Sequence, residues 1–128
     1  MTRILVADDS EVVRRGISRL LSEHQDWEVC GEAVDGLETV AMAKQLAPDV
    51  VILDFAMPVM NGIDAAREIL KTHPKTEIVL CSMYLDSQLA AVASGVGIRS
   101  LLSKSNVGKV VDGVEAALRG ESFHESKI

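Results

Sequence analysis

Short apolar segments alternate with longer segments of helical period along the whole chain. Five of the short segments are rich in Val, Ile and Leu and lack the polar alternation of half-exposed strands, which indicates burial on both faces. Strands that alternate with helices build a parallel sheet covered by helices on both sides. The pattern therefore predicts an α/β fold of five βα units, with strands at Arg3–Asp8, Glu28–Ala33, Val50–Asp54, Glu77–Ser82 and Arg99–Ser103.

The helical segments carry boundary residues and apolar stripes that agree with this division. Ser10 can cap the first helix, Pro48 and Pro74 end the second and third, and Gly120 ends the last. With 128 residues the chain is long enough for one domain, which we place at 1–120, and 121–128 are predicted to be a tail or the start of a linker to an output domain that this chain does not contain. The stripes are Val13, Ile17, Leu20 and Leu21 in the first helix, and Val110, Val111, Val114, Ala117 and Leu118 in the last.

Polar or ionisable residues stand at the carboxyl ends of four of the five predicted strands. They are Asp8 with Asp9, then Asp54, Ser82 and Lys104. Because ligands of parallel α/β sheets bind at this edge, we expect these side chains to converge. Two carboxylates about 4 Å apart repel by roughly 4 kcal/mol at an effective dielectric near 20. A hard divalent cation such as Mg²⁺, which binds carboxylate oxygens and often lies beside phosphate, would offset that repulsion.

Carboxylates, a lysine and a hydroxyl at one edge are what phosphoryl transfer requires, because that reaction depends on positioning and charge neutralisation. Each residue alone has a simpler interpretation, as a helix N-cap, a solvated charge or a turn residue. Their joint placement favours the functional one. The predicted roles are phosphoacceptor for Asp54, phosphoryl contacts for Lys104 and Ser82, and Mg²⁺ ligands for Asp8, Asp9, Asp54 and the backbone carbonyl of Ala56.

The same positions lie in runs that can be matched as motifs. The longest begins at Asp54, ends at Gly62 and reads D-x-x-M-P-x-M-N-G; the others are Leu5-Val6-Ala7-Asp8-Asp9-Ser10, Ile78-Val79-Leu80-Cys81-Ser82 and Leu101-Leu102-Ser103-Lys104. Together they resemble the receiver domains of two-component response regulators over nearly the whole chain. The finer match, which includes Met83 and Tyr84 after Ser82, is similar to the NarL/FixJ branch of that family.

The resemblance implies both a topology and a function. It implies a flavodoxin-like, doubly wound five-stranded parallel sheet in the order 2-1-3-4-5. It also implies that Asp54 accepts a phosphoryl group from a sensor histidine kinase with the help of Mg²⁺, and that the domain then changes conformation. Phosphorylation-dependent homodimerisation is a further implication. In the NarL/FixJ branch a separate DNA-binding domain usually follows, so transcription is the implied output.

Some positions depart from the family or modulate its switch. Receivers usually carry Tyr or Phe three residues before the lysine, where this chain has Leu101. Coupling is therefore expected to pass through aliphatic repacking and through the loop after Ser82, in which Met83 and Tyr84 are predicted to screen Asp54 partly from water. Gly62 is predicted to free the backbone at the start of a helix.

Composition and single positions disfavour several other functions. A net charge of −6 and 3% aromatic residues disfavour direct contact with nucleic acid or a membrane, and no apolar run approaches membrane-spanning length, so a cytoplasmic protein is expected. A small Mg²⁺-dependent phosphohydrolase would need a second acid or base two residues after Asp54, where Ala56 stands. An interaction module that is never phosphorylated would not need the acidic residues. The prediction is therefore a phosphoacceptor that assists its own phosphorylation and dephosphorylation, not an enzyme.

Overall fold

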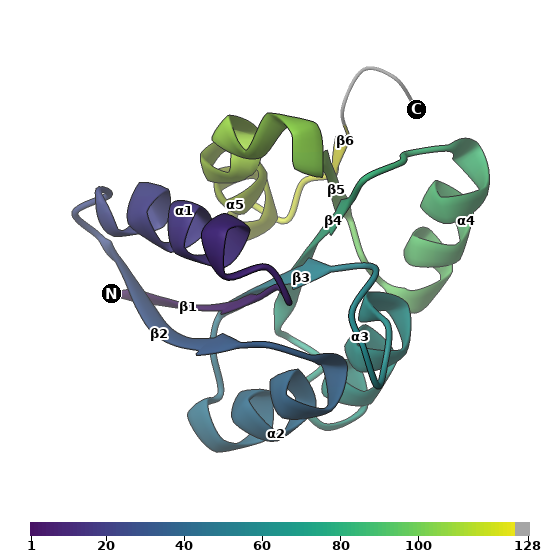
Figure 1. Ribbon diagram of the computed structural model, residues 1–128, viewed down its shortest axis with the longest axis horizontal. Coiled ribbons are helices and arrows are strands. Elements are labelled where there is room, and N and C mark those ends of the chain that lie inside the picture. Colours follow the sequence, from purple (N-terminus) through teal and green to yellow (C-terminus); the bar gives the residue numbers. More distant parts are fainter. Residues whose placement is uncertain (125–128) are drawn as a thin grey trace.

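Five βα units and a short final strand follow one another along the chain (Figure 1). The structure is a computed structural model that describes residues 1–124. Its elements are β1 (Thr2–Ala7), α1 (Glu11–Ser22), β2 (Trp27–Ala33), α2 (Gly36–Leu46), β3 (Val50–Asp54), α3 (Gly62–Thr72), β4 (Glu77–Ser82), α4 (Ser87–Val96), β5 (Ser100–Ser103), the 3₁₀ helix η1 (Lys104–Lys109), α5 (Val110–Leu118) and β6 (Phe123–His124).

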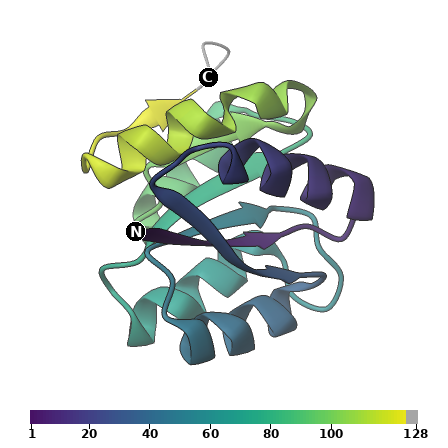
Figure 2. The same ribbon diagram turned by 90° about the vertical axis from the view of Figure 1, so that its left-hand side faces the viewer.

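All strands of the sheet run parallel, in the order β2-β1-β3-β4-β5-β6. Helices α1 and α5 cover one face and α2, α3 and α4 the other, and Figure 2 shows α1 and α5 together on one side of the sheet. Alternate residues of β1 serve the two faces: Ile4 and Val6 pack toward α1 and α5, and Leu5 and Ala7 toward the opposite helices. The doubly wound α/β fold predicted from the sequence is confirmed.

The central strands explain why no polar alternation was visible in the sequence. Every residue of β3 is buried, and in β4 only Glu77 is not. Strand β2 differs because it lies at the edge of the sheet, where Glu28 and Glu32 are exposed. Burial on both faces therefore holds for the interior strands. One of them, β3, ends in Asp54.

A sixth strand extends the predicted five-stranded sheet. Phe123 and His124 pair with Ser100 and Leu101 of β5, and the backbone N–H of Phe123 donates to the carbonyl of Arg99 at 3.0 Å. Phe123 also packs against the apolar cluster under α1 and α5. Part of the predicted tail is thus ordered as strand, while residues 125–128 of that tail lie outside the described residues. Two paired residues are too few to give a strand pattern in sequence.

The helix boundaries follow the predicted signals. The hydroxyl of Ser10 accepts a hydrogen bond from the N–H of Val13 at 3.3 Å, as an N-cap does. The second and third helices end just before Pro48 and Pro74, and Gly120 follows the last helix with a φ of 72°. One stripe residue was placed wrongly: Leu118, the last residue of α5, is 43% exposed. In the described part of the chain, no helix has the length and apolar character needed to cross a membrane.

The only tryptophan in the sequence lies at the amino end of β2. Its ring is buried and stacks on the imidazole of His24, with the ring centres 3.8 Å apart and the planes 5° from parallel. His24 lies in the turn that joins α1 to β2. This aromatic pair therefore lies at the amino end of the edge strand β2, away from the carboxyl ends of the strands.

Candidate functional site

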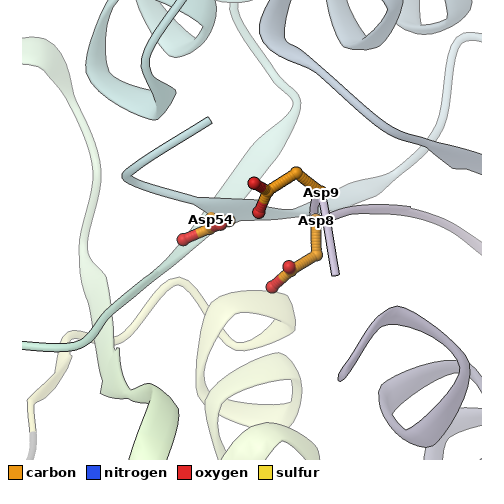
Figure 3. Close-up of side chains that lie close together, drawn as sticks. All are labelled: Asp8, Asp9 and Asp54. Carbon is orange, nitrogen blue, oxygen red and sulfur yellow. The ribbon is translucent and has the colours of Figure 1, made fainter. Parts of the chain in front are cut away.

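The strand register brings the predicted polar residues to one edge of the sheet. Ala7 pairs with Leu53, so Asp8 and Asp54, the next residues of each chain segment, come side by side. Figure 3 shows the side chains of Asp8, Asp9 and Asp54 gathered at the ends of β1 and β3. One carboxylate oxygen from each of the three residues can be chosen so that all three oxygens lie within 4.8 Å of one another. Ser82 pairs with Ser103, and this pairing places Lys104 just beyond the same edge.

Lys104 contacts two of the three carboxylates. Its ammonium group lies 3.2 Å from Oδ2 of Asp54, and 3.3 Å and 3.0 Å from Oδ1 and Oδ2 of Asp8. Asp8 and Asp54 are almost fully buried and Asp9 is exposed. The site is therefore a buried ion cluster with one face open to solvent at Asp9.

The donor set of the cluster fits a hard divalent cation. Among residues 1–124, the cluster holds three carboxylates and one ammonium group, so negative charge is in excess. The contact from Lys104 to Oδ2 of Asp8 is an ion pair without hydrogen-bond geometry, and this buried oxygen has no hydrogen-bond partner among residues 1–124. A buried oxygen in that position is costly unless another group binds it. The residues present can thus hold a metal ion such as Mg²⁺.

The environment of Asp54 shifts its acid–base behaviour. Burial, followed by the charge of Asp8, raises the pKa of Asp54 to about 6, although Lys104 and the N–H of Ala56, 3.3 Å from Oδ1, act in the opposite direction. For Lys104, burial by itself would lower the pKa, but the hydrogen bond and charge of Asp8, together with those of Asp54, raise it overall. Lys104 therefore stays protonated when Asp54 titrates.

The raised pKa of Asp54 predicts how stability depends on pH without metal. Because the folded pKa of about 6 exceeds the ordinary value, the folded state binds more protons than the unfolded chain between about pH 6 and pH 4. We expect the free energy of unfolding, measured with urea in the presence of a chelator, to rise as the pH falls through this window. Asp54→Asn should be more stable than the parent at pH 7 by about 1–2 kcal/mol and should lose this dependence. Equal stability of the two proteins at pH 7 would contradict the prediction.

Ser82, Met83 and Tyr84 line a groove next to the cluster. The hydroxyl of Ser82 donates to the backbone carbonyl of Tyr84 at 3.0 Å and accepts from its N–H at 3.3 Å. Met83 and Tyr84 are 62% and 83% exposed, and they line a groove of about 670 Å³ together with Phe55 and Ala56. Ser82 is therefore engaged with its own loop, and the two following side chains stand out into solvent.

Leu101 and Gly62 lie behind the site. Leu101 is fully buried in the core on the side of α2, α3 and α4. Gly62 begins α3, and its backbone is not in the left-handed region, so the predicted need for backbone freedom was wrong. The reason for glycine is space: a Cβ there would lie 2.5 Å from the carbonyl oxygen of Asp54 and 3.0 Å from Cα of Phe55.

One residue close to the acidic pair was not predicted from the sequence. Nη1 of Arg14, in α1, donates to the backbone carbonyl of Asp8 at 3.0 Å. Helical side chains lean toward the helix N-terminus, and Arg14 stands four residues after the N-cap Ser10. A long basic side chain at that place could have been expected to reach back over the β1–α1 loop.

Comparisons with known proteins agree with this geometry. The family model for the response regulator receiver domain matches residues 4–115. The chain belongs to the response regulator receiver family. The receiver is 39% identical over 130 residues to the transcriptional regulatory protein LiaR of Bacillus subtilis, an alignment that covers 100% of this chain and 61% of LiaR. It therefore spans about three-fifths of the length of that relative.

Solved receiver structures superpose on this receiver closely. A two-component response regulator of the LuxR family from Aurantimonas sp. is 30% identical with a TM-score of 0.93, covering 100% of this chain and 93% of the other. The signal receiver domain of the response regulator NarL from Mycobacterium tuberculosis is 30% identical with a TM-score of 0.85, covering 94% and 98%. The similarity to the NarL-like branch that the sequence indicated is confirmed.

Proposed function

We propose that this receiver accepts a phosphoryl group from a sensor histidine kinase onto Asp54 and thereby controls transcription through a DNA-binding output domain. The observation that carries the proposal is the buried carboxylate of Asp54, held beside two further carboxylates and within hydrogen-bond distance of the Lys104 ammonium group. Sequence similarity to a transcriptional regulatory protein supports the proposed output. A location in the cytoplasm follows from such a partner and such an output.

In the proposed step, a carboxylate oxygen of Asp54 attacks the phosphorus atom of a phosphohistidine, the P–N bond breaks, and the imidazole nitrogen leaves. An acyl phosphate then stands on Asp54. Asp8, Asp9, Asp54 and the backbone carbonyl of Ala56 would hold Mg²⁺, which when bound neutralises charge on the phosphoryl oxygens. Lys104, which already lies 3.2 Å from Asp54, would pair with the phosphoryl group.

The conformational response would begin at Ser82. A hydroxyl has one proton to donate, so Ser82 must release the carbonyl of Tyr84 before it can donate to a phosphoryl oxygen. That exchange frees the loop that leads into α4. Leu101 has no aromatic ring that could change its rotamer in the switch. Its burial in the core supports a switch that depends on movement of this loop and on aliphatic repacking. Homodimerisation on phosphorylation belongs to the proposal as a consequence of the switch.

Intact-mass spectrometry after incubation with phosphoramidate and Mg²⁺ tests the proposed function. We expect a stable mass increase of one phosphoryl group that is absent in Asp54→Asn. Continuous release of inorganic phosphate with no stable adduct would indicate a phosphohydrolase instead. No adduct and no turnover would indicate an interaction module, and either result would overturn the proposal.

The side chain of Met83 should affect the lifetime of the acyl phosphate. Met83 is mostly exposed in this structure, yet it stands next to Ser82 and lines the groove beside Ala56. If the loop closes when Ser82 moves, Met83 limits the approach of water to the phosphoryl group. We expect Met83→Ala to shorten the half-life of the phosphorylated protein about two- to fivefold, equivalent to roughly 0.5–1 kcal/mol in the barrier. The measurement is decay of the mass adduct after the donor is removed, and an unchanged half-life would rule this role out.

A further inference from the structure

Arg14 lies in α1 with only 11% of its side chain exposed, whereas the side chain of Arg15 beside it is 68% exposed. Its guanidinium group makes two directed contacts. Nε donates to Oε1 of Glu32 in β2 at 2.8 Å, and Nη1 donates to the backbone carbonyl of Asp8 at 3.0 Å. Arg14 therefore joins α1, the edge strand β2 and the β1–α1 loop.

The contact with Asp8 completes the restraint on the loop that carries the acidic pair. The backbone N–H of Asp8 donates to the carbonyl of Ala33 at 3.1 Å, and Oδ1 of Asp8 accepts from the N–H of Ser10 at 2.8 Å. The carbonyl held by Arg14 belongs to the peptide that links Asp8 to Asp9. Rotation of that peptide would change where both carboxylates point. Arg14 thus restrains the one peptide that sets the two side chains relative to each other.

We infer that Arg14, oriented by Glu32, is a positioning residue for the carboxylates that bind Mg²⁺. This inference rests on the proposed function, since it assigns a role in the metal site of that function. A positive charge near a cation site opposes cation binding by electrostatics alone. The favourable contribution of Arg14 must therefore come from the geometry that its two hydrogen bonds impose. Outer groups that orient metal ligands typically affect metal affinity by about 10–100-fold.

The sign of the change in Mg²⁺ affinity separates positioning from charge. In Arg14→Gln a positive charge is lost, so electrostatics predicts tighter Mg²⁺ binding, whereas lost positioning predicts binding weaker by about tenfold. In Arg14→Lys the charge is kept but a single ammonium group cannot bridge the carbonyl of Asp8 and Glu32 in the same way. For this variant, electrostatics predicts an unchanged Mg²⁺ affinity, whereas lost positioning again predicts weaker Mg²⁺ binding. Arg15→Gln is the matched control, with the same charge change on an exposed neighbour.

The experiment is a titration of each folded variant with Mg²⁺ followed by amide chemical shifts, with circular dichroism and urea unfolding recorded on the same samples. We expect weaker binding in both Arg14 variants, parental binding in Arg15→Gln, and near-parental phosphorylation of the Arg14 variants by phosphoramidate once Mg²⁺ is saturating. Parental or tighter Mg²⁺ binding in Arg14→Lys or Arg14→Gln overturns the inference, even if their stability is reduced. Absence of Mg²⁺ binding in the parent protein overturns the metal part of the proposed function instead, and so distinguishes the two failures.

Discussion

Asp9→Ala is expected to weaken Mg²⁺ binding by tenfold or more and to slow phosphorylation by phosphoramidate at limiting Mg²⁺. The side chain of Asp9 is the exposed member of the carboxylate cluster, so the fold does not depend on it. A charged contact is worth about 1.5–3 kcal/mol, which corresponds to roughly a tenfold to hundredfold change in affinity. The free energy of unfolding without metal should stay within about 0.5 kcal/mol of the parent value.

Glu23→Ala provides the control for this variant, because it removes the same charge at the other end of α1. Its Mg²⁺ affinity should equal that of the parent. A parental dissociation constant for Mg²⁺ in Asp9→Ala, measured by isothermal titration calorimetry, would show that Asp9 is not a ligand. The proposed metal site would then have to be built from Asp8, Asp54 and the backbone carbonyl of Ala56.

Gly62→Ala is expected to destabilise the protein by about 3 kcal/mol or more. The added methyl group would lie 2.5 Å from the carbonyl oxygen of Asp54 and 2.9 Å from Cδ1 of Leu80. Leu80 is fully buried and the Asp54 carbonyl belongs to the central strand, so neither neighbour can move away without disturbing the core. Relief of the clash requires movement of the β3–α3 loop, which carries Ala56. Phosphorylation of Asp54 should therefore slow together with the loss of stability, which urea unfolding measures.

Gly16→Ala makes the same chemical change where, apart from the adjacent residues and the backbone of α1 itself, no atom lies within 4 Å of the new Cβ. Gly16 is inside α1, so alanine there should stabilise the protein by about 0.5–1 kcal/mol. If Gly62→Ala lowers the free energy of unfolding and Gly16→Ala raises it, the loss of stability at Gly62 comes from the contact with β3. Equal stability of Gly62→Ala and the parent would mean that the loop has room to adjust.

The interior of the fold could be predicted because two-sided burial leaves a direct mark on sequence. Val50–Asp54 and Glu77–Ser82 agree residue by residue with β3 and β4, since each contains an uninterrupted apolar run that is followed directly by a polar residue. The polar residues at the strand ends could be placed together for the same reason. Parallel strands in register bring their carboxyl ends to one edge whatever the helices between them do.

What could not be predicted depends on contacts between segments far apart in the sequence. Arg14 looks like any helical arginine until β2 places Glu32 beside it. Gly62 looks like a flexible turn residue until the carbonyl of Asp54 is seen against it. The strand β6 exists only because β5 offers a free edge to two residues that have no strand pattern of their own. The two hydrogen bonds between the Ser82 hydroxyl and the backbone of Tyr84 likewise depend on how the loop after β4 folds back.

The stacked pair of Trp27 and His24 has a practical consequence for optical assays of this receiver. The indole of Trp27 lies at the amino end of β2 and Asp54 at the carboxyl end of β3, so tryptophan emission should report unfolding of the α1–β2 turn. The single tyrosine, Tyr84, stands in the loop that Ser82 holds. A fluorotyrosine label at Tyr84 should therefore report phosphorylation of Asp54 as it occurs. The fluorescence emission of Trp27 should stay unchanged during the same reaction.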